Sequence, residues 1–304
     1  MAITNFAELK AALQGMQPVV VSVAYATEPE VIDSIKCARD LGFIGRAFLS
    51  GPPEEIRAAI HQAGDDPSHY DILPAADPAE AARLAVEPIR QGTAKVLVKG
   101  NLKTEAYLKA ILDKDTGIRS APLLSNVSIF EMASYPKFLA LTDNAVVIAP
   151  TLDEKKIIIE NTAPLWKALG ITPPKVAVLA AVETVSSKMP ATIDAAALVV
   201  MSTRGQIKGF LLDGPLAYDA AISKEAAAIK GIVDSPVIGD PDLLLAPNIE
   251  TGNALGKSFK FHGQATWGGL VFGAKVPAIL NSRSDDRQNR LNSLMLARII
   301  AEHR

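Results

Sequence analysis

The feature that most constrains the fold is the alternation of short apolar runs with segments of helical periodicity. Residues 19–23, 46–50, 70–74 and 95–99 are runs of strand length, rich in apolar residues. The segments between them repeat apolar residues at the spacing of an amphipathic helix. Strands that alternate with helices of this length are typical of βαβ units and a mostly parallel sheet. The sequence therefore predicts an α/β protein.

The same alternation continues through the second half of the chain. We expect strands at 138–142 and 145–149, joined as an antiparallel pair by an Asx-type turn at Asp143 and Asn144. Residues 118–135 carry mixed signals and predict no definite element. The remaining expected elements are helices at 153–169, 193–203, 218–229 and 286–303 and strands at 176–182, 210–212, 243–246 and 277–280.

Bulk properties narrow the class of protein. The chain has 304 residues, of which 49% are hydrophobic and 21% charged, as expected for one large or two medium globular domains. A formal net charge of -2 argues against a general nucleic-acid binder. No apolar run reaches the ~18 residues of a membrane helix, and the N-terminus does not resemble a signal peptide. Cys37 is the single cysteine, so we expect no intrachain disulfide. These features together favour a cytoplasmic location and no membrane partner.

Polar loops follow the predicted strands, at the place where open α/β sheets bind ligands. After the strand at 277–280 come Ser282 and Arg283. Arginine offers a fork of donors that fits phosphate or carboxylate, and serine can donate to a developing oxyanion. The alternative is a strand-end serine and a solvated arginine, with Ser284 or Asp285 capping the last helix.

Three further loops show the same combination of glycine and polar side chains. In the loop from Lys99 to Thr104, the glycine permits close approach of a ligand and Thr104 can cap a helix whose free amides attract anions. Asp213-Gly214-Pro215 is a turn signal, and the loop at 247–253 continues toward Lys257. Each has an ordinary structural reading, but a chain with only structural constraints has little reason to repeat the pattern at four strand ends.

The usual signatures of other chemistries are missing. The sequence contains no G-x-G-x-x-G after a strand, no G-x-x-x-x-G-K-[ST] and no G-x-S-x-G. The four histidines are scattered and carry no metal-ligand spacing. We therefore expect no metal.

Several segments together resemble the phosphate acetyl/butyryl transferases, and the butyryltransferase branch in particular. They are LAAVETVSSKMPATIDAAAL at 179–198, RGQIKGFLLDGPLAYDAAIS at 204–223, GDPDLLLAPNIETGNALGKS at 239–258 and GAKVPAILNSRSDD at 273–286. KGNLKT, GIRSAPLLSNVSIFE and LTDNAVVIAP look like the same family, so the resemblance covers about residues 95–300.

The resemblance implies an enzyme that moves a short acyl group, acetyl or butyryl, between coenzyme A and inorganic phosphate. Acyl-CoA and phosphate are then substrates, with no permanently bound cofactor. It also implies two three-layer α/β/α domains with mostly parallel sheets and an inter-domain cleft, similar to isocitrate and isopropylmalate dehydrogenases. We expect domain I at 1–140 together with 275–304, domain II at 141–274, and a homo-oligomer, with a dimer favoured.

The resemblance also assigns roles to residues. Ser282 and Arg283 become catalytic, with arginine holding the attacking phosphate and serine or a loop amide stabilising the oxyanion. No metal and no covalent enzyme nucleophile is needed. The expected substrate-binding residues are Lys99, Asn101, Thr104, Asn126, Asp213, Asn248, Gly252, Asn253 and Lys257.

One departure concerns the acid or base that protonates the coenzyme A thiolate or deprotonates the thiol. The acetyl branch has an aspartate seven residues after the serine, where this chain has Asn289. The butyryl branch has an acid three residues after the serine, which matches Asp285 here. Asp286 is a second candidate, and a thiolate aided only by local positive charge is a third possibility.

Two other functions compete with acyl transfer. A decarboxylating nicotinamide-dependent dehydrogenase of related fold needs a divalent metal, which Asp213 and Asp219 would have to help bind. The other competing function is that of a weakly catalytic module, which binds coenzyme A or an anion and regulates a partner. If the acyl pocket has apolar walls, Phe130, Met132 and Met189 are candidates for them, although core packing is the ordinary role of such residues.

Overall fold

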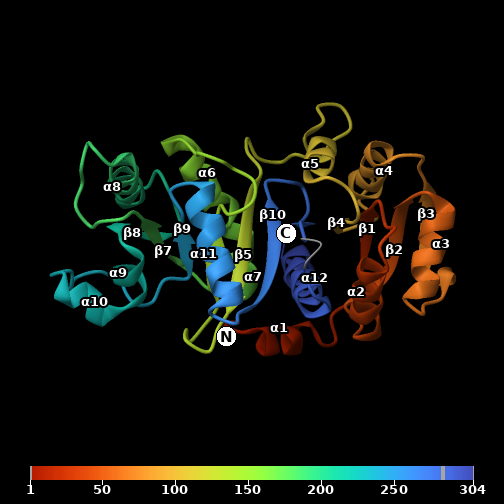
Figure 1. Ribbon diagram of the computed structural model, residues 1–304, viewed down its shortest axis with the longest axis horizontal. Helices are drawn as coiled ribbons and strands as arrows, with labels where there is room; N and C mark the ends of the chain where they lie inside the picture. The colour runs from red at the N-terminus through yellow and green to blue at the C-terminus, as the bar shows by residue number, and fades with distance from the viewer. Residues whose placement is uncertain (1, 282–284, 304) are drawn as a thin grey trace. The chain divides into compact units, whose positions relative to one another are not determined.

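A computed structural model describes residues 2–281 and 285–303. The chain divides into two compact units, each assembled from segments that are distant in the sequence (Figure 1). Unit 1 consists of Met1–Asn5 and Leu123–Thr266, and unit 2 consists of Phe6–Pro122 and Trp267–Arg304.

Unit 2 is built on a mostly parallel sheet with the strand order β3-β2-β1-β4-β11-β10. Neighbours are parallel from β3 to β11, whereas β10 and β11 are antiparallel. Ala24 pairs with Lys99 and Val98 pairs with Ile279, so β1, β4 and β11 end at the same edge. The strands are β1 (Val19–Ala24), β2 (Ile44–Gly51), β3 (Tyr70–Pro74), β4 (Val96–Lys99), β10 (Thr266–Phe272) and β11 (Ala278–Ile279).

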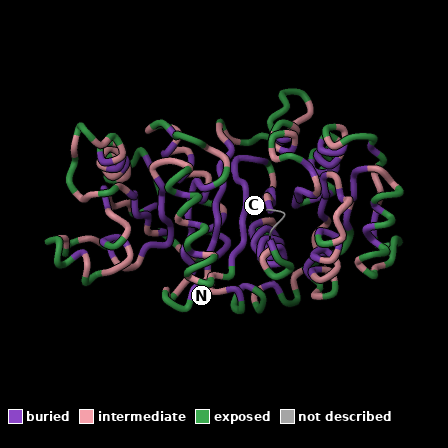
Figure 2. The backbone as a smooth tube through the Cα atoms, viewed as in Figure 1, coloured by how far each residue is buried: buried purple, intermediate pink, exposed green. Residues whose placement is uncertain are grey.

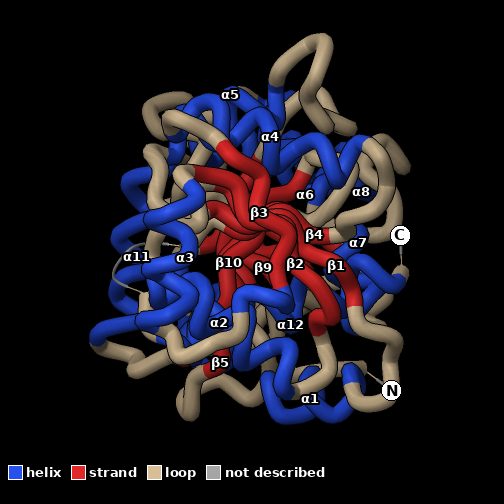
Figure 3. The backbone as a smooth tube through the Cα atoms, turned by 90° about the vertical axis from the view of Figure 1, so that its right-hand side faces the viewer, coloured by secondary structure: helices blue, strands red, loops and turns tan. Residues whose placement is uncertain are grey.

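Helices cover both faces of this sheet. Figure 3 shows α4 (Pro78–Arg90) and α5 (Thr104–Leu112) on one side of the strands and α2 (Pro29–Asp40) and α12 (Arg287–Glu302) on the other. The remaining helices of unit 2 are α1 (Phe6–Leu13), α3 (Pro53–Gln62) and the short 3-10 turn η1 (Pro67–His69).

The α4 helix shows how sequence and packing agree. Asp77 caps it, because its carboxylate accepts hydrogen bonds from the Ala79 and Glu80 amides, with proline as the first helical residue. Its buried face then meets the sheet through Ser22 and Ser50. Their hydroxyls donate to main-chain carbonyls of the helix at 2.7 Å.

Unit 1 has the strand order β5-β6-β9-β7-β8, antiparallel between β5 and β6 and parallel elsewhere. The strands are β5 (Ser125–Glu131), β6 (Leu139–Thr142), β7 (Lys175–Leu179), β8 (Leu211–Leu216) and β9 (Leu243–Leu245). The predicted hairpin of 138–142 with 145–149 is wrong, since 145–149 forms no strand. The Asp143 carboxylate accepts from the Ala145 and Val146 amides at 2.8 Å, so this segment is an Asx turn, and β6 pairs with β5 and β9 instead.

The helices of unit 1 are α6 (Leu152–Asn161), α7 (Ala163–Leu169), α8 (Pro190–Thr203), α9 (Tyr218–Ile222), α10 (Lys224–Ile229) and α11 (Ile249–Phe261). Two predicted long helices are each divided in two. Pro164, which has no amide hydrogen, opens α7 after a break at Thr162, and Ser223 ends α9 and caps α10. The cap of α6 is Thr151, which forms a capping box with Glu154.

Two boundaries between the units lie after Pro122 and after Thr266. The sequence analysis expects these boundaries after residues 140 and 274. The first difference arises because β5 and β6 extend the sheet that contains β9. The second arises because β10 is held by α12: the Trp267 amide donates to Asn289 Oδ1 and the Gly269 amide to Ser293 Oγ, both at 3.0 Å. The central strands of each unit are buried and most helices are exposed on their outer side, whereas α12 is buried along Arg290–Ile300 (Figure 2).

A partly buried ion pair in unit 2, between Arg39 and Asp65, gives the first prediction. Burial by itself would raise the pKa of Asp65, but hydrogen bonds from Arg39 and Tyr70 outweigh that effect and lower the pKa to about 2. Replacing Asp65 by Asn should therefore cost about 2 kcal/mol of unfolding free energy at neutral pH. A carboxyl whose folded pKa is depressed stabilises the fold above its unfolded pKa, and this contribution is lost as the pH falls toward about 2.

Denaturant unfolding of the wild type and Asp65→Asn at pH 7 and at successively lower pH measures this difference. Asp71→Asn is the matched control, because its pair with Arg46 is exposed and should contribute less than about 1 kcal/mol. Equal losses in the two variants, or a difference that does not shrink with acidification, would contradict the assignment.

Candidate active site

In unit 2, the predicted substrate-binding residues after β4 lie at the edge of the sheet where β1 and β11 also end. Lys99 is buried, and its ammonium donates to the Gly100 carbonyl at 3.3 Å. The main-chain amide of Gly100 donates to the carbonyl of Ala24, the last residue of β1, and that of Asn101 donates to the carbonyl of Tyr25, which follows β1. A Cβ on Gly100 would lie 2.4 Å from the Tyr25 carbonyl oxygen, so only glycine fits here.

The two other predicted residues of this loop have modest roles. The Asn101 amide lies 3.5 Å from the Thr27 hydroxyl, and its side chain is half-buried. Thr104 is the first residue of α5 rather than its cap, and the cap position, Lys103, makes no side-chain bond to the helix. The prediction that Thr104 caps the helix is wrong, which leaves its half-buried hydroxyl beside the first turn.

The segment after β11 contains the predicted catalytic residues. Ser282 and Arg283 lie outside the described residues. Asp285 is buried, and its Oδ2 accepts a hydrogen bond from the Asn281 amide at 3.2 Å. Arg290 of α12 donates from Nε to the Asp285 main-chain carbonyl at 3.2 Å.

The cap of α12 separates the two candidate acids. Asp286 occupies the cap position, and its Oδ1 accepts from the Asn289 amide at 2.8 Å. Capping therefore belongs to Asp286, and Asp285 is held inside unit 2 by other contacts. Asn289, which stands where the acetyl branch has its aspartate, accepts the Trp267 amide with its side chain and anchors β10.

In unit 1 a second group of predicted residues gathers around the Asp143 turn, at the carboxyl end of β6. The main-chain amide of Asn126 donates to Asp143 Oδ2 at 2.8 Å, and the main-chain carbonyl of Asn126 accepts from the Thr142 hydroxyl at 2.8 Å. Asn144 exchanges hydrogen bonds with Ser128. Burial raises the pKa of Asp143, while the surrounding amide donors act in the opposite direction.

The residues predicted as a loop after β9 form the start of α11, which the sequence analysis did not predict. Asn248 is the cap, accepting from the Thr251 amide at 3.0 Å. Gly252 faces the Asp143 carbonyl so closely that a Cβ would lie 2.3 Å from its oxygen. Asn253 donates to the Asn144 carbonyl at 3.1 Å. Helix α11 is thus joined to the turn at 143–144 along its first turns.

Two predicted binding residues lie apart from this junction. Lys257 is exposed, about 13 Å along α11 from its cap at the rise of an α-helix. Asp213 lies within β8, opposite Ala177, rather than in a loop after the strand, and its Oδ1 accepts from the Gly214 amide. Asp219 forms an ion pair with Lys230 at 2.7 Å, and Lys230 also pairs with Glu183.

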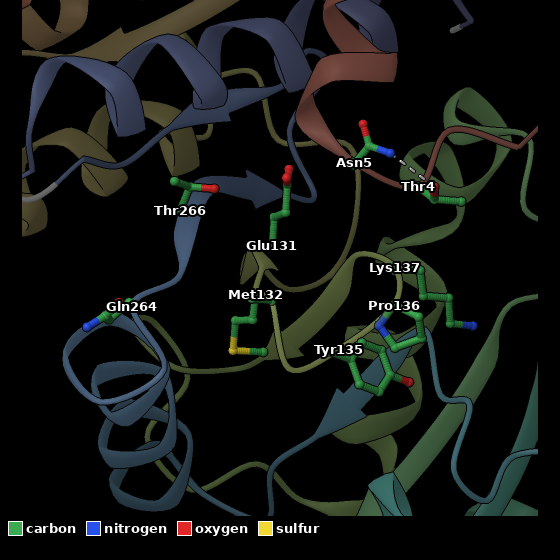
Figure 4. Close-up of a pocket in the computed structure, with 10 residues that line it drawn as sticks. Thr4, Asn5, Glu131, Met132, Tyr135, Pro136, Lys137, Gln264 and Thr266 are labelled. Atoms are coloured by element: carbon green, nitrogen blue, oxygen red, sulfur yellow. Dashed lines mark hydrogen bonds between the residues drawn. The ribbon is translucent and has the colours of Figure 1, made fainter.

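A pocket of about 400 Å³ lies in unit 1 near the amino end of β6, the opposite edge from the Asp143 turn. Figure 4 shows Glu131, Met132 and Tyr135 among its lining residues, and Lys137 at its rim is paired with Asp240 and Asp242. No residue predicted for catalysis or substrate binding lines this pocket. Of the residues suggested as acyl-pocket walls, Met132 lies here, Phe130 packs edge-to-face on Phe259 in the core, and Met189 precedes α8.

Within residues 2–281 and 285–303, no group of three or more His, Cys, Asp or Glu side chains is arranged to hold a metal ion. Over the same residues, no helix combines the length and apolar character needed to cross a membrane.

Comparison with known proteins assigns the family. The family described as phosphate acetyl/butaryl transferase matches residues 75–298. A probable phosphate butyryltransferase of Bacillus subtilis (strain 168) is 42% identical over 91% of this chain and 91% of its own length. The chain belongs to the phosphate acetyl/butyryl transferase family. This confirms the resemblance given by the sequence motifs.

Both branches of the family are represented among similar proteins. A phosphate acetyltransferase of Rhizobium meliloti is 38% identical over 99% of this chain and 95% of its own length. The crystal structure of a branched-chain phosphotransacylase from Enterococcus faecalis V583 superimposes with a TM-score of 0.82 at 32% identity, covering 94% of this chain and all of that one. The mixed α/β fold with a mostly parallel sheet is therefore shared with this phosphotransacylase.

The sequence analysis assigned no role at the site to two further residues, although it placed Asp143 in an Asx-type turn. Asn281 contacts the Asp285 carboxylate, and Asp143 organises the turn that meets α11. Both lie inside segments that carry the family resemblance. Each also contacts a residue that is distant in the sequence, Ser293 for Asn281 and Asn126 for Asp143, and these distant contacts depend on the fold.

The junction of α11 with the Asp143 turn gives the second prediction. Alanine normally stabilises a helix by about 1 kcal/mol relative to glycine. Gly252→Ala should nevertheless lower stability by about 1–3 kcal/mol, because its methyl group would collide with the Asp143 carbonyl, a main-chain atom that cannot rotate away.

Thermal unfolding of this variant beside Ser258→Ala, an exposed position on the same helix, isolates the collision. The control should change stability by less than about 0.5 kcal/mol. A Gly252→Ala protein as stable as the wild type would show that α11 does not approach the turn this closely.

Proposed function

We propose that this protein transfers a short acyl group, acetyl or butyryl, between coenzyme A and inorganic phosphate, so that acyl-CoA and phosphate give acyl phosphate and free coenzyme A. The observation that carries the proposal is near full-length identity of 38–42% to a phosphate acetyltransferase and a probable phosphate butyryltransferase. Buried polar residues at strand ends in both units agree with a protein that binds polar substrates there.

In the reaction, an oxygen of phosphate attacks the thioester carbonyl carbon and forms a tetrahedral oxyanion. The intermediate collapses by breaking the C–S bond, which leaves acyl phosphate and the coenzyme A thiolate. We assign Arg283 to hold the phosphate and Ser282 to donate to the oxyanion, on the basis of the family motif. Lys99, at the edge where β4 and β11 end, supplies positive charge within unit 2.

We assign to Asp285 the transfer of the proton to and from the coenzyme A sulfur. A protonated Asp285 gives its proton to the departing thiolate, and in the reverse direction the carboxylate takes the proton from the coenzyme A thiol. Its burial and the separate capping role of Asp286 support this choice. A substitution of Asp285 therefore leaves the cap of α12 in place.

We further propose that residues of unit 1 bind substrate. Asn126, Gly252 and Asn253 meet the Asp143 turn, and Asn248 caps the helix that carries Gly252 and Asn253; these contacts support a role in shaping a rigid binding surface. Direct binding roles for Asn101, Thr104, Asp213 and Lys257 rest on the family motifs alone. A dehydrogenase-like domain arrangement, a homodimer and a cytoplasmic location remain predictions.

The alternatives have less support. A decarboxylating dehydrogenase would use Asp213 and Asp219 as metal ligands, but Asp219 is paired with Lys230 and Asp213 lies within β8. A regulatory module that binds coenzyme A without turnover has no feature in its favour beyond the shared substrates.

The third prediction is the activity itself. Incubation with butyryl-CoA or acetyl-CoA should release free thiol at a rate that depends on phosphate, followed with a thiol reagent. Sulfate in place of phosphate is the control for ionic strength. Binding of coenzyme A without turnover, or reduction of a nicotinamide cofactor with a hydroxy-diacid, would point to one of the other functions.

The fourth prediction separates the two candidate acids. Asp285→Asn should lower kcat for formation of acyl-CoA from acyl phosphate and coenzyme A by about 100-fold or more. Asp286→Asn should retain the wild-type rate, because asparagine caps helices as well as aspartate does. The reverse order of effects would transfer the role to Asp286, and full activity in both would mean that no carboxylate acts here.

A further inference from the structure

We propose that Asn281 is a positioning residue that holds the Asp285 carboxylate in place for proton transfer with the coenzyme A thiol. The inference rests on the proposed function and adds to it a residue that the motifs do not assign. It concerns the two residues that flank the Ser-Arg motif, both of which the structure describes.

The geometry places the Asn281 side chain between two partners. Asn281 is buried just beyond the end of β11. Its Nδ2 donates to Asp285 Oδ2 at 3.2 Å and lies 3.4 Å from Ser293 Oγ. A single amide group, with two N–H donors, thus joins the carboxylate to a residue of α12.

Ser293 makes this contact rigid. Its hydroxyl is fully buried, donates to the Asn289 carbonyl at 3.0 Å and accepts from the Gly269 amide of β10 at 3.0 Å. Asn281 is therefore fixed relative to α12 and β10 as well as to its own strand. A side chain locked in this way can present a donor to Asp285 with little loss of freedom.

A donor aimed at a buried carboxylate favours its charged form, which is the form that accepts the thiol proton. Among the described residues, charged groups on the neighbouring elements include Arg287 and Arg290 of α12, Asp286 at its cap and Lys99 of β4. Arg290 donates to the Asp285 main-chain carbonyl, and Asp286 is engaged as the helix cap. Asn281 contacts the carboxylate itself, so it can control both the direction of Asp285 and its proton affinity.

The test is the pH profile of acyl-CoA formation from butyryl phosphate and coenzyme A, with Asn281→Leu and Asn281→Ser compared with the wild type. Leucine keeps the volume and removes the donor. Its kcat should fall about 10- to 100-fold with KM for coenzyme A changed less than about twofold. The acidic limb of the profile should move to higher pH, because loss of the donor favours the protonated carboxyl. Serine keeps one smaller donor and should lie between leucine and the wild type.

Asn292→Leu is the matched control. It removes another buried amide of unit 2, whose Nδ2 donates to the Trp267 carbonyl at 3.2 Å, without touching Asp285. It should reduce thermal stability and leave the pH profile in place. If Asn281→Leu does not fold, Asn281→Ser decides the question.

The outcomes separate this inference from the proposed function. A pH profile of the Asn281 variants that matches Asn292→Leu, while Asp285→Asn is impaired, overturns the positioning role and leaves the proposed function standing. Wild-type turnover in Asp285→Asn also overturns the positioning role, because Asn281 would then hold a residue that takes no part in the reaction. Absence of phosphate-dependent thiol release in the wild type overturns the proposed function and the inference with it.

Discussion

Parallel pairing of β4 with β1 and β11 is the constraint on which the chemistry of unit 2 depends. The register of these strands brings Lys99 and Asn281 to one edge of the sheet, although about 180 residues separate them in the sequence. The same edge receives Asp285, which is held there by Asn281 at its carboxylate and by the Arg290 side chain at its main-chain carbonyl. Without this register the predicted residues would be scattered polar side chains.

Unit 1 depends on a different contact, the close approach of α11 to the Asp143 turn. Several hydrogen bonds converge there: the Asp143 carboxylate accepts from the main-chain amides of its own turn and of Asn126, and the Asn253 side chain donates to the Asn144 carbonyl. Gly252 makes the approach possible because it carries no side chain. Residues that the family motifs mark as binding residues thus also maintain the shape of the surface, and substitutions at them will change stability as well as affinity.

The sequence predicts most of the strands and the family, because these depend on local apolar patterns and on extended motifs. It does not predict α11, since Gly252, Asn253 and Gly256 all disfavour a helix interior. What makes the helix is the Asn248 cap together with tertiary packing, such as the contact of Phe259 with Phe130. The sequence does not distinguish Asp285 from Asp286 either, because each of the two acids could cap the last helix. Only the three-dimensional arrangement assigns the cap to Asp286 and leaves Asp285 beside Asn281.

The central claim is that phosphate attacks the thioester directly, with the protein supplying position, charge and a proton acceptor but no covalent nucleophile. Isotope exchange between labelled coenzyme A and butyryl-CoA tests this most directly. Without phosphate the account predicts no exchange, and addition of phosphate should start it, because label can return only through acyl phosphate. Exchange at a comparable rate in the absence of phosphate would reveal an acyl-enzyme and contradict the account.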